Sequence, residues 1–182
     1  MLKLKDIRTE LKFNKNIGLS IFCVRDLIAK NERYNLDFDV YLPTKGKNLQ
    51  RPFCWTLLQK QELIMSILKG IRIPVLAIIQ HTDDYKTRDE KVYHIIDGKQ
   101  RLSTMISFAK GEFPIVFNEQ EYFISDLDEW AAREILNYWV TADVAYSYPD
   151  VPITDEQKIA WFEMINFAGT PQDIEHLNNL KA

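Results

Sequence analysis

The sequence lacks clusters of metal-binding cysteines and histidines. Only two of its 182 residues are cysteine, Cys23 and Cys54, and they lie far apart beside apolar residues. We expect both to be reduced, buried thiols. No Cys-x-x-Cys pair or Cys/His cluster occurs, which argues against a structural zinc site. Of the three histidines, we expect His81 and His176 to be solvated and His94 to face either a ligand or the solvent.

Long apolar runs are lacking as well. No segment approaches the ~18 apolar residues that a membrane-spanning helix needs. The first residues contain no uninterrupted apolar segment of signal-peptide type. We therefore expect a cytoplasmic protein with no membrane partner.

A third absence is an excess of positive charge. The formal net charge is -3 and the sequence pI is about 5.7. A protein that holds DNA only by coating its phosphates is usually basic, so any contact with nucleic acid has to be local. The Walker A loop, the His-Glu-x-x-His zinc motif and a Ser-His-Asp set of recognisable spacing are also missing.

What is present is an ordinary globular composition, 46% hydrophobic and 27% charged. The length suits one domain whose core needs no disulfide or metal. Hydrophobic periodicity and capping residues predict a mixture of strands and helices, which indicates an α+β fold. The predicted strands cover residues 37–42, 75–79, 92–96, 113–117, 121–124 and 138–146. The predicted helices cover residues 20–30, 56–69, 99–110, 126–137, 154–167 and 172–180, with Ser20, Thr56 and Thr154 as expected N-caps.

The sharpest local pattern is an apolar strand that runs into the segment Asp97–Arg101 and then directly into a helix. Gly98 permits turn dihedrals and a close approach of backbone to a ligand. The free N–H groups of the helix's first turn, together with its dipole, attract an anion. Lys99 and Arg101 add positive charge, and arginine can hold a phosphate with two hydrogen bonds. Asp97 is suited to hold a hydrated Mg²⁺ ion or to orient a nucleophile.

A second pattern, Leu49–Thr56, places polar and basic residues before aromatic ones at the start of a helix. Gln50 and Arg51 would reach a base edge or a phosphate, and Trp55 would stack on a base. The third pattern is Asn166, which stands near a predicted helix C-terminus before Gly-Thr. At that place an asparagine side chain would contact a ligand.

Each pattern also has a structural explanation, and these alternatives stay open at this point. Asp97 would simply cap the helix, and Gly98 would only turn the chain. The aromatic residues of the second pattern would belong to the core, with Arg51 paired to a surface acid. Asn166 would be an ordinary C-cap.

Together these stretches resemble the N-terminal domain of GmrSD-type restriction proteins, within the wider ParB/sulfiredoxin-like superfamily. The family's motifs occur in the family's order, and the resemblance covers about residues 35–175 of a single domain, 1–182. They are the Gln-Arg-Pro-aromatic-x-Trp stretch at Gln50–Trp55, the small-basic-Ile-Pro strand entry at Gly70–Pro74, the Ile-Asp-Gly-Gln-Gln-Arg-Leu signature at Ile96–Leu102, and the Phe-x-x-Ile-Asn-x-x-Gly-Thr-Pro stretch at Phe162–Pro171. The resemblance implies a small mixed sheet flanked by helices, with a C-terminal helical portion.

The resemblance also implies nucleotide binding and hydrolysis, with the Asp-Gly-x-Gln-Arg turn at the phosphates. The leading hypothesis is therefore a Mg²⁺-dependent NTP-hydrolysing domain, a phosphohydrolase related to DNA restriction or phage defence. Its catalytic residues would be Asp97, Gln100 and Arg101, with Asp97 also holding the metal. The phosphates and the base would be bound by Gly98, Lys99, Gln50, Arg51, Thr104 and Asn166, with Trp55 as the stacking residue.

The chain departs from the family in two respects. The family commonly joins this domain to a C-terminal HNH-type nuclease, but we expect no such nuclease in this chain, which ends at Ala182. We expect a fragment, a stand-alone version, or a part that a nuclease domain in another chain completes. Second, Lys99 replaces the usual first Gln of the signature, a change that would strengthen anion binding.

Two hypotheses of other classes remain open. The first is a non-catalytic DNA-binding or modified-DNA-sensing module, in which Lys45, Lys47, Gln50, Arg51 and Trp55 contact backbone and base. The second is a regulator that acts through protein contacts, which the acidic charge balance permits.

Overall fold

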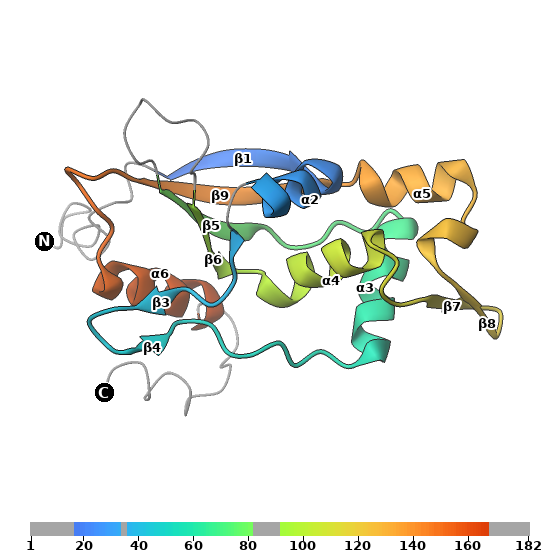
Figure 1. Ribbon diagram of the computed structural model, residues 1–182, viewed down its shortest axis with the longest axis horizontal. Coiled ribbons are helices and arrows are strands. Elements are labelled where there is room, and N and C mark those ends of the chain that lie inside the picture. The colour runs from blue at the N-terminus through green and yellow to red at the C-terminus, as the bar shows by residue number, and fades with distance from the viewer. Residues whose placement is uncertain (1–16, 34–35, 82–91, 168–182) are drawn as a thin grey trace, which may run out of the picture.

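A mixed five-stranded sheet forms the centre of the molecule (Figure 1). The computed structural model describes residues 17–33, 36–81 and 92–167. In spatial order, the strands are β1 (Ile17–Cys23), β9 (Trp139–Ser147), β5 (Leu76–His81), β6 (Val92–Asp97) and β2 (Leu36–Asp37). β9 and β5 are parallel, as are β6 and β2, whereas the β1–β9 and β5–β6 pairs are antiparallel. The predicted α+β class is confirmed.

Helices cover both faces of this sheet. The first face carries α2 (Val24–Arg33), α3 (Leu57–Leu68), α4 (Lys99–Ala109) and α5 (Glu129–Leu136). α6 (Asp155–Phe167) covers the second face and packs on β6. α6 supplies the C-terminal helical portion, while the helix predicted over residues 172–180 lies outside the described residues.

Two small hairpins complete the architecture. One is formed by β3 (Tyr41–Leu42) and β4 (Lys47–Asn48), and it packs with α6 on the second face. The other is formed by β7 (Ile115–Phe117) and β8 (Gln120–Tyr122), which follow α4. The strand pair predicted after this helix is thus confirmed.

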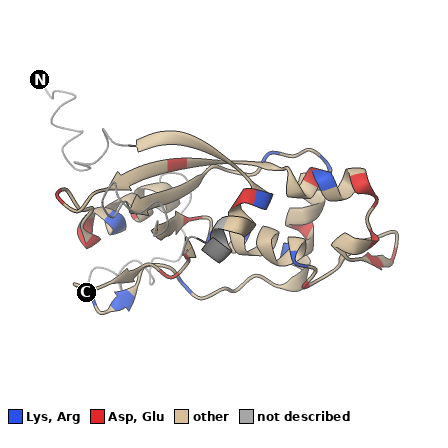
Figure 2. Cartoon of the chain, turned by 45° about the horizontal axis from the view of Figure 1, so that its top comes forward, with Lys and Arg blue, Asp and Glu red and all other residues tan. Residues whose placement is uncertain are grey.

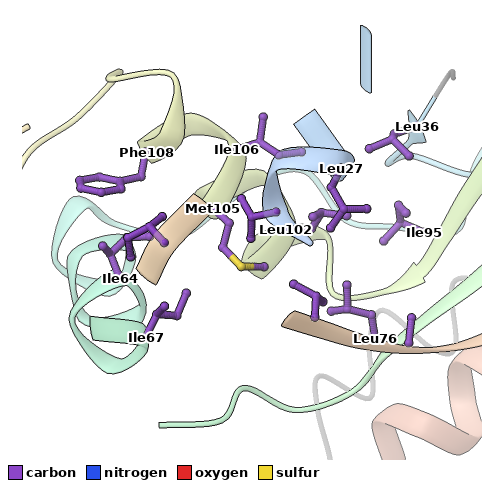
Figure 3. Packing of buried hydrophobic residues seen from close by; sticks show 14 of the residues in the cluster. Leu27, Leu36, Ile64, Ile67, Leu76, Ile95, Leu102, Met105, Ile106 and Phe108 are labelled. Atoms are coloured by element: carbon purple, nitrogen blue, oxygen red, sulfur yellow. The ribbon is translucent and has the colours of Figure 1, made fainter. Parts of the chain in front are cut away.

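The alternation of apolar residues along β5 explains why the molecule has two cores. Leu76 and Ile78 point to the first face, whereas Ala77 and Ile79 point to the second, and all four are buried. A strand covered on both sides is expected to be a continuous apolar run. The larger core is made of buried side chains from α2, α3, α4 and α5 and from strands β2, β5, β6, β7 and β9. Figure 3 shows part of it. Its labelled members are Leu27, Leu36, Ile64, Ile67, Leu76, Ile95, Leu102, Met105, Ile106 and Phe108.

The predicted helix over residues 20–30 is wrong at its start. Ser20 is not a helix cap but lies in β1, opposite Ala142 of β9. The helix begins at Val24, whose backbone N–H donates to the carbonyl of Tyr138. The start of this segment has helical spacing, but its pairing with β9, more than a hundred residues away, makes it a strand. No local sequence pattern reveals that pairing.

The predicted strand over residues 37–42 is interrupted. Asp37 turns the chain, because its Oδ1 accepts hydrogen bonds from the backbone N–H groups of Asp39 and Val40, each at 2.9 Å. Val40 adopts φ 53°, a left-handed conformation that ends the extended run. β2 and β3 are therefore separate strands that belong to different sheets.

Two smaller differences concern a helix start and a thiol. The helix predicted over residues 126–137 starts later, because α5 begins after Asp128, whose side chain accepts from the N–H of Ala131. Cys23 is buried as expected, but Cys54 is exposed. No helix of the described residues has the length and apolarity that crossing a membrane requires.

Candidate functional site

The turn between β6 and α4 places charged residues around the start of a helix. Gly98 precedes the helix with φ 104° and ψ 9°, and it has no side chain with which to cap the first turn. A Cβ atom at this position would lie 2.2 Å from Leu76 Cδ2, so the close packing on β5 also requires glycine. The first-turn N–H groups thus emerge beside a bare backbone, the arrangement that attracts anions.

Asp97 and Arg101 form an ion pair across this turn. The distance between Arg101 Nη2 and Asp97 Oδ2 is 2.5 Å, and the two side chains are 14% and 23% exposed. Arg101 Nη1 also donates to the carbonyl of Pro74. Asp97 is therefore engaged with the guanidinium one helical turn later, and the ion pair holds Arg101 at the edge of the sheet.

Lys99 is almost fully buried and pairs with Asp39. The distance between Lys99 Nζ and Asp39 Oδ1 is 2.5 Å. The parallel pairing of Asp37 with His94 explains how a residue sixty positions away reaches the helix, because both strands end at the same edge. Sequence reasoning missed Asp39, since only the β2–β6 pairing brings it to this site.

Two glutamines join the second motif to the first. Gln50 Nε2 donates to the carbonyls of Ile95 and Ile96, the last residues of β6 before Asp97. Gln100 Oε1 accepts the backbone N–H groups of Cys54 at 2.9 Å and Trp55 at 3.2 Å. The structure thus brings together two stretches that are about fifty residues apart in the sequence.

The amide nitrogen of Gln100 contacts the second motif as well, because Nε2 donates to the carbonyl of Pro52 at 3.3 Å. Its amide is therefore used on both sides to hold the loop before α3. This geometry makes Gln100 a positioning residue, because its side chain is engaged with backbone.

Arg51 and Trp55 lie on this held loop. Arg51 is exposed, and within the described part of the chain no hydrogen bond or ion pair is recorded for it. Trp55 is half-buried. Over the described chain as a whole, basic and acidic residues are interspersed along the ribbon (Figure 2). Arg51 thus stands between Gln50, which contacts β6, and Pro52, which contacts α4.

Thr104 and Asn166 have contrasting surroundings. Thr104 is fully buried in α4, and its Oγ1 has no hydrogen-bond partner among the described residues. It lies one helical turn after Gln100 on the same side of the helix. Asn166 Nδ2 donates to the carbonyl of Phe162 within α6 at 2.8 Å. The Gly169-Thr170-Pro171 stretch beyond it lies outside the described residues.

A histidine pair lies on the sheet behind the turn. His94 Nδ1 is 3.0 Å from His81 Nε2, and His94 Nε2 is 3.5 Å from Asp37 Oδ2. The pKa of His94 is lowered to about 4, first by burial and then by the charges of His81 and Lys158, against the opposing effects of Asp37 and Asp155. His81 is thus in contact with His94 and half-buried, and the expectation of full solvation is wrong. His176 lies outside the described residues.

The fold and this turn define a class: a small α+β domain in which Asp97, Lys99 and Arg101 stand together at one strand-to-helix junction. The model of the GmrSD restriction endonuclease N-terminal domain family matches residues 24–180, so the chain belongs to this family. The resemblance inferred from the motifs is thereby confirmed. The chain is a domain of the type found in a restriction system. Searches of curated proteins and of solved structures gave no significant match.

Proposed function

We propose that this domain binds a nucleoside triphosphate at the start of α4 and hydrolyses it with the help of Mg²⁺. The observation that carries the proposal is the joining of Gln50–Trp55 to Asp97–Arg101 by the side chains of Gln50 and Gln100. Two motifs that are separate in the sequence thereby surround one uncapped helix start. The hydrogen bonds between the two motifs fix the geometry of the site before a ligand binds.

The residues suit the requirements of phosphoryl transfer, which depends mainly on positioning and charge neutralisation. First-turn N–H groups of α4 and the exposed Arg51 would hold phosphate oxygens. Trp55 would stack on the base, and Thr104 Oγ1 is a buried hydroxyl without a hydrogen-bond partner among the described residues. Asp97 would orient the water whose oxygen bonds to the terminal phosphorus as the bond to the bridging oxygen breaks and the diphosphate leaves. One proton of that water stays on the released phosphate, and the other passes to the solvent.

A magnesium ion fits this site only together with the substrate. No three His, Cys, Asp or Glu side chains gather into a metal site within residues 17–33, 36–81 and 92–167. Mg²⁺ often takes one or two carboxylates and completes its shell with phosphate oxygens and water. Asp97 is the carboxylate that would hold it, and the ion would neutralise charge on the phosphates.

Phosphate release from each of the four ribonucleoside triphosphates, with and without Mg²⁺, tests the proposal. We expect Mg²⁺-dependent release that falls by at least about tenfold in Arg51→Ala, because one charge-assisted contact is lost. Arg72→Ala removes another exposed arginine and should leave the rate unchanged. Folded protein that neither binds nor hydrolyses any of the four would contradict the proposal.

A second candidate function is DNA binding without catalysis. Lys45, Lys47 and Arg51 lie on or beside the β3–β4 hairpin, and Arg51 is exposed. Gln50 would not take part, because its amide donates to β6. This candidate predicts binding that weakens steeply with salt and upon Arg51→Ala, whether or not nucleotide is present. A nuclease domain, in the same protein or in another chain, would then be the partner that acts on the DNA.

A further inference from the structure

The ion pair of Lys99 with Asp39 is unequal in exposure. The Lys99 side chain is 8% exposed and that of Asp39 is 61% exposed. A buried ammonium that loses its counterion has a high free energy, whereas a released surface carboxylate is readily hydrated. Of the two partners, Asp39 is therefore the one that can leave, provided that another anion takes its place.

The turn that carries Asp39 holds its backbone firmly. Asp37 Oδ1 accepts from the N–H groups of Asp39 and Val40, and the N–H of Gln50 donates to the Asp39 carbonyl at 3.1 Å. Val40 is buried at φ 53°, which is strained for a β-branched residue. A strained conformation persists only where its surroundings enforce it, so this turn presents the carboxylate to Lys99 with only its side chain left to move.

We infer that Asp39 is a built-in competitor for the anion of this site. In the absence of ligand, its carboxylate neutralises Lys99, and a phosphate oxygen replaces it when the ligand binds. The inference deepens the proposed function and rests on it, since it assigns the charge requirement of the same site. A ligand whose charge is too weak to displace the carboxylate would be excluded, which favours polyphosphates.

This competition between Asp39 and the ligand depends on Lys99, which is the residue that distinguishes the chain from the family signature. The signature that the chain resembles has Gln at this position, and a neutral amide needs no counterion. Replacing it by a buried lysine creates a charge that the fold has to satisfy in both the empty and the occupied state. Asp39 neutralises the Lys99 ammonium in the empty state, and the ligand neutralises it in the occupied state.

Calorimetric titration with inorganic tripolyphosphate, without metal, tests the inference independently of base and of hydrolysis. We expect Asp39→Asn to bind about fivefold more tightly than the unchanged protein, because the competing ion pair is gone. Tripolyphosphate should also raise the melting temperature of Asp39→Asn by more, because it restores a partner to the buried ammonium. Glu121→Gln on β8, an exposed carboxylate beyond the far end of α4, makes the same charge change elsewhere and should bind as before.

A double-mutant cycle distinguishes displacement of Asp39 from Lys99 from a general electrostatic effect of removing one negative charge. In a Lys99→Gln background, Asp39→Asn should change the affinity less than about twofold, because no ammonium remains to compete for. An equal gain in both backgrounds, or none in either with binding intact, would overturn the inference and leave the proposed function standing. Failure of every variant to bind tripolyphosphate and nucleotide would remove both.

Discussion

The backbone conformation at position 98 and the close packing around it both require glycine. The φ of Gly98, 104°, lies in a region that side chains rarely adopt, and an added Cβ would meet Leu76 at 2.2 Å. We expect Gly98→Ala to lower the free energy of unfolding by about 2–4 kcal/mol, measured by urea denaturation. Gly111→Ala is the matched control, since it has φ 75° but open space around it, and it should cost about 1 kcal/mol. Equal losses would show that the contact with Leu76 is unimportant.

His94 should make stability depend on pH. Its folded-state pKa of about 4 lies below the ordinary value of 6.5. The unfolded chain therefore binds more protons between these values, and stability falls as the pH is lowered from 6.5 towards 4, by up to about 3 kcal/mol. The effect belongs to the His81–His94 pair, since the two rings lie within hydrogen-bond distance of each other. Urea denaturation at pH 7 and pH 4.5 should show a smaller difference for His94→Gln, and an unchanged difference would contradict the assignment.

At the scale of elements, α4 and the loop before α3 depend on each other through Gln100. Its amide makes three hydrogen bonds to Pro52, Cys54 and Trp55. In Gln100→Leu, the amide hydrogens of Cys54 and Trp55 should exchange at least about tenfold faster, because opening the loop no longer breaks these bonds. Gln61→Leu removes a comparable bond to Pro114 and should leave both amides protected. Unchanged exchange in Gln100→Leu would show that other contacts hold the loop.

The elements that the sequence predicts well are those with local signals. α3 is one of them, because Thr56 and Gln59 form a capping box and Gly70 follows with φ 74°. β1 was missed because its partner is β9, and the break after β2 was missed because one side chain, Asp37, turns the chain. In each case the deciding contact is either distant in the sequence or made by a residue that fits a strand pattern equally well.

The same distinction applies to the site. The placement of Asp97, Gly98 and Arg101 at one turn was predictable because a strand, a glycine and a helix follow one another within a few residues. Gln50 was expected to contact a ligand, so its hydrogen bonds to β6 were not foreseen, nor was the pairing of Lys99 with Asp39. Both depend on which strands meet at one edge of the sheet, which the pattern of a single segment does not determine.

At the scale of the whole molecule, a buried ion pair ties the β3–β4 hairpin to α6. Asp155 Oδ2 accepts the N–H and the hydroxyl of Thr44, and Lys158 Nζ lies 3.1 Å from Oδ1. Burial alone would raise the pKa of Asp155, but these hydrogen bonds and the lysine charge lower it below 3.8. The stability that this carboxylate contributes is thus present above pH 3.8 and is lost as the pH falls further.

Breaking this pair should destabilise the second core as a unit. Asp155→Asn leaves a buried lysine without its counterion, and we expect a loss of about 3 kcal/mol in urea denaturation. Changing Lys158 to Met in the same protein should recover part of this loss, since the unpaired charge is removed. Asp150→Asn, which alters an exposed carboxylate, should have almost no effect. No recovery in the double variant would indicate that the hydrogen bonds to Thr44 dominate.

The central claim is that nucleotide phosphates bind where β6 meets α4. Amide chemical shifts measured during titration with non-hydrolysable analogues of ATP and GTP address it directly. The largest changes are expected at Gly98, Lys99 and Gln100, with smaller ones at Arg51 across the site. Changes confined to distant elements such as β7 and β8, or no changes at saturating concentration, would contradict the claim.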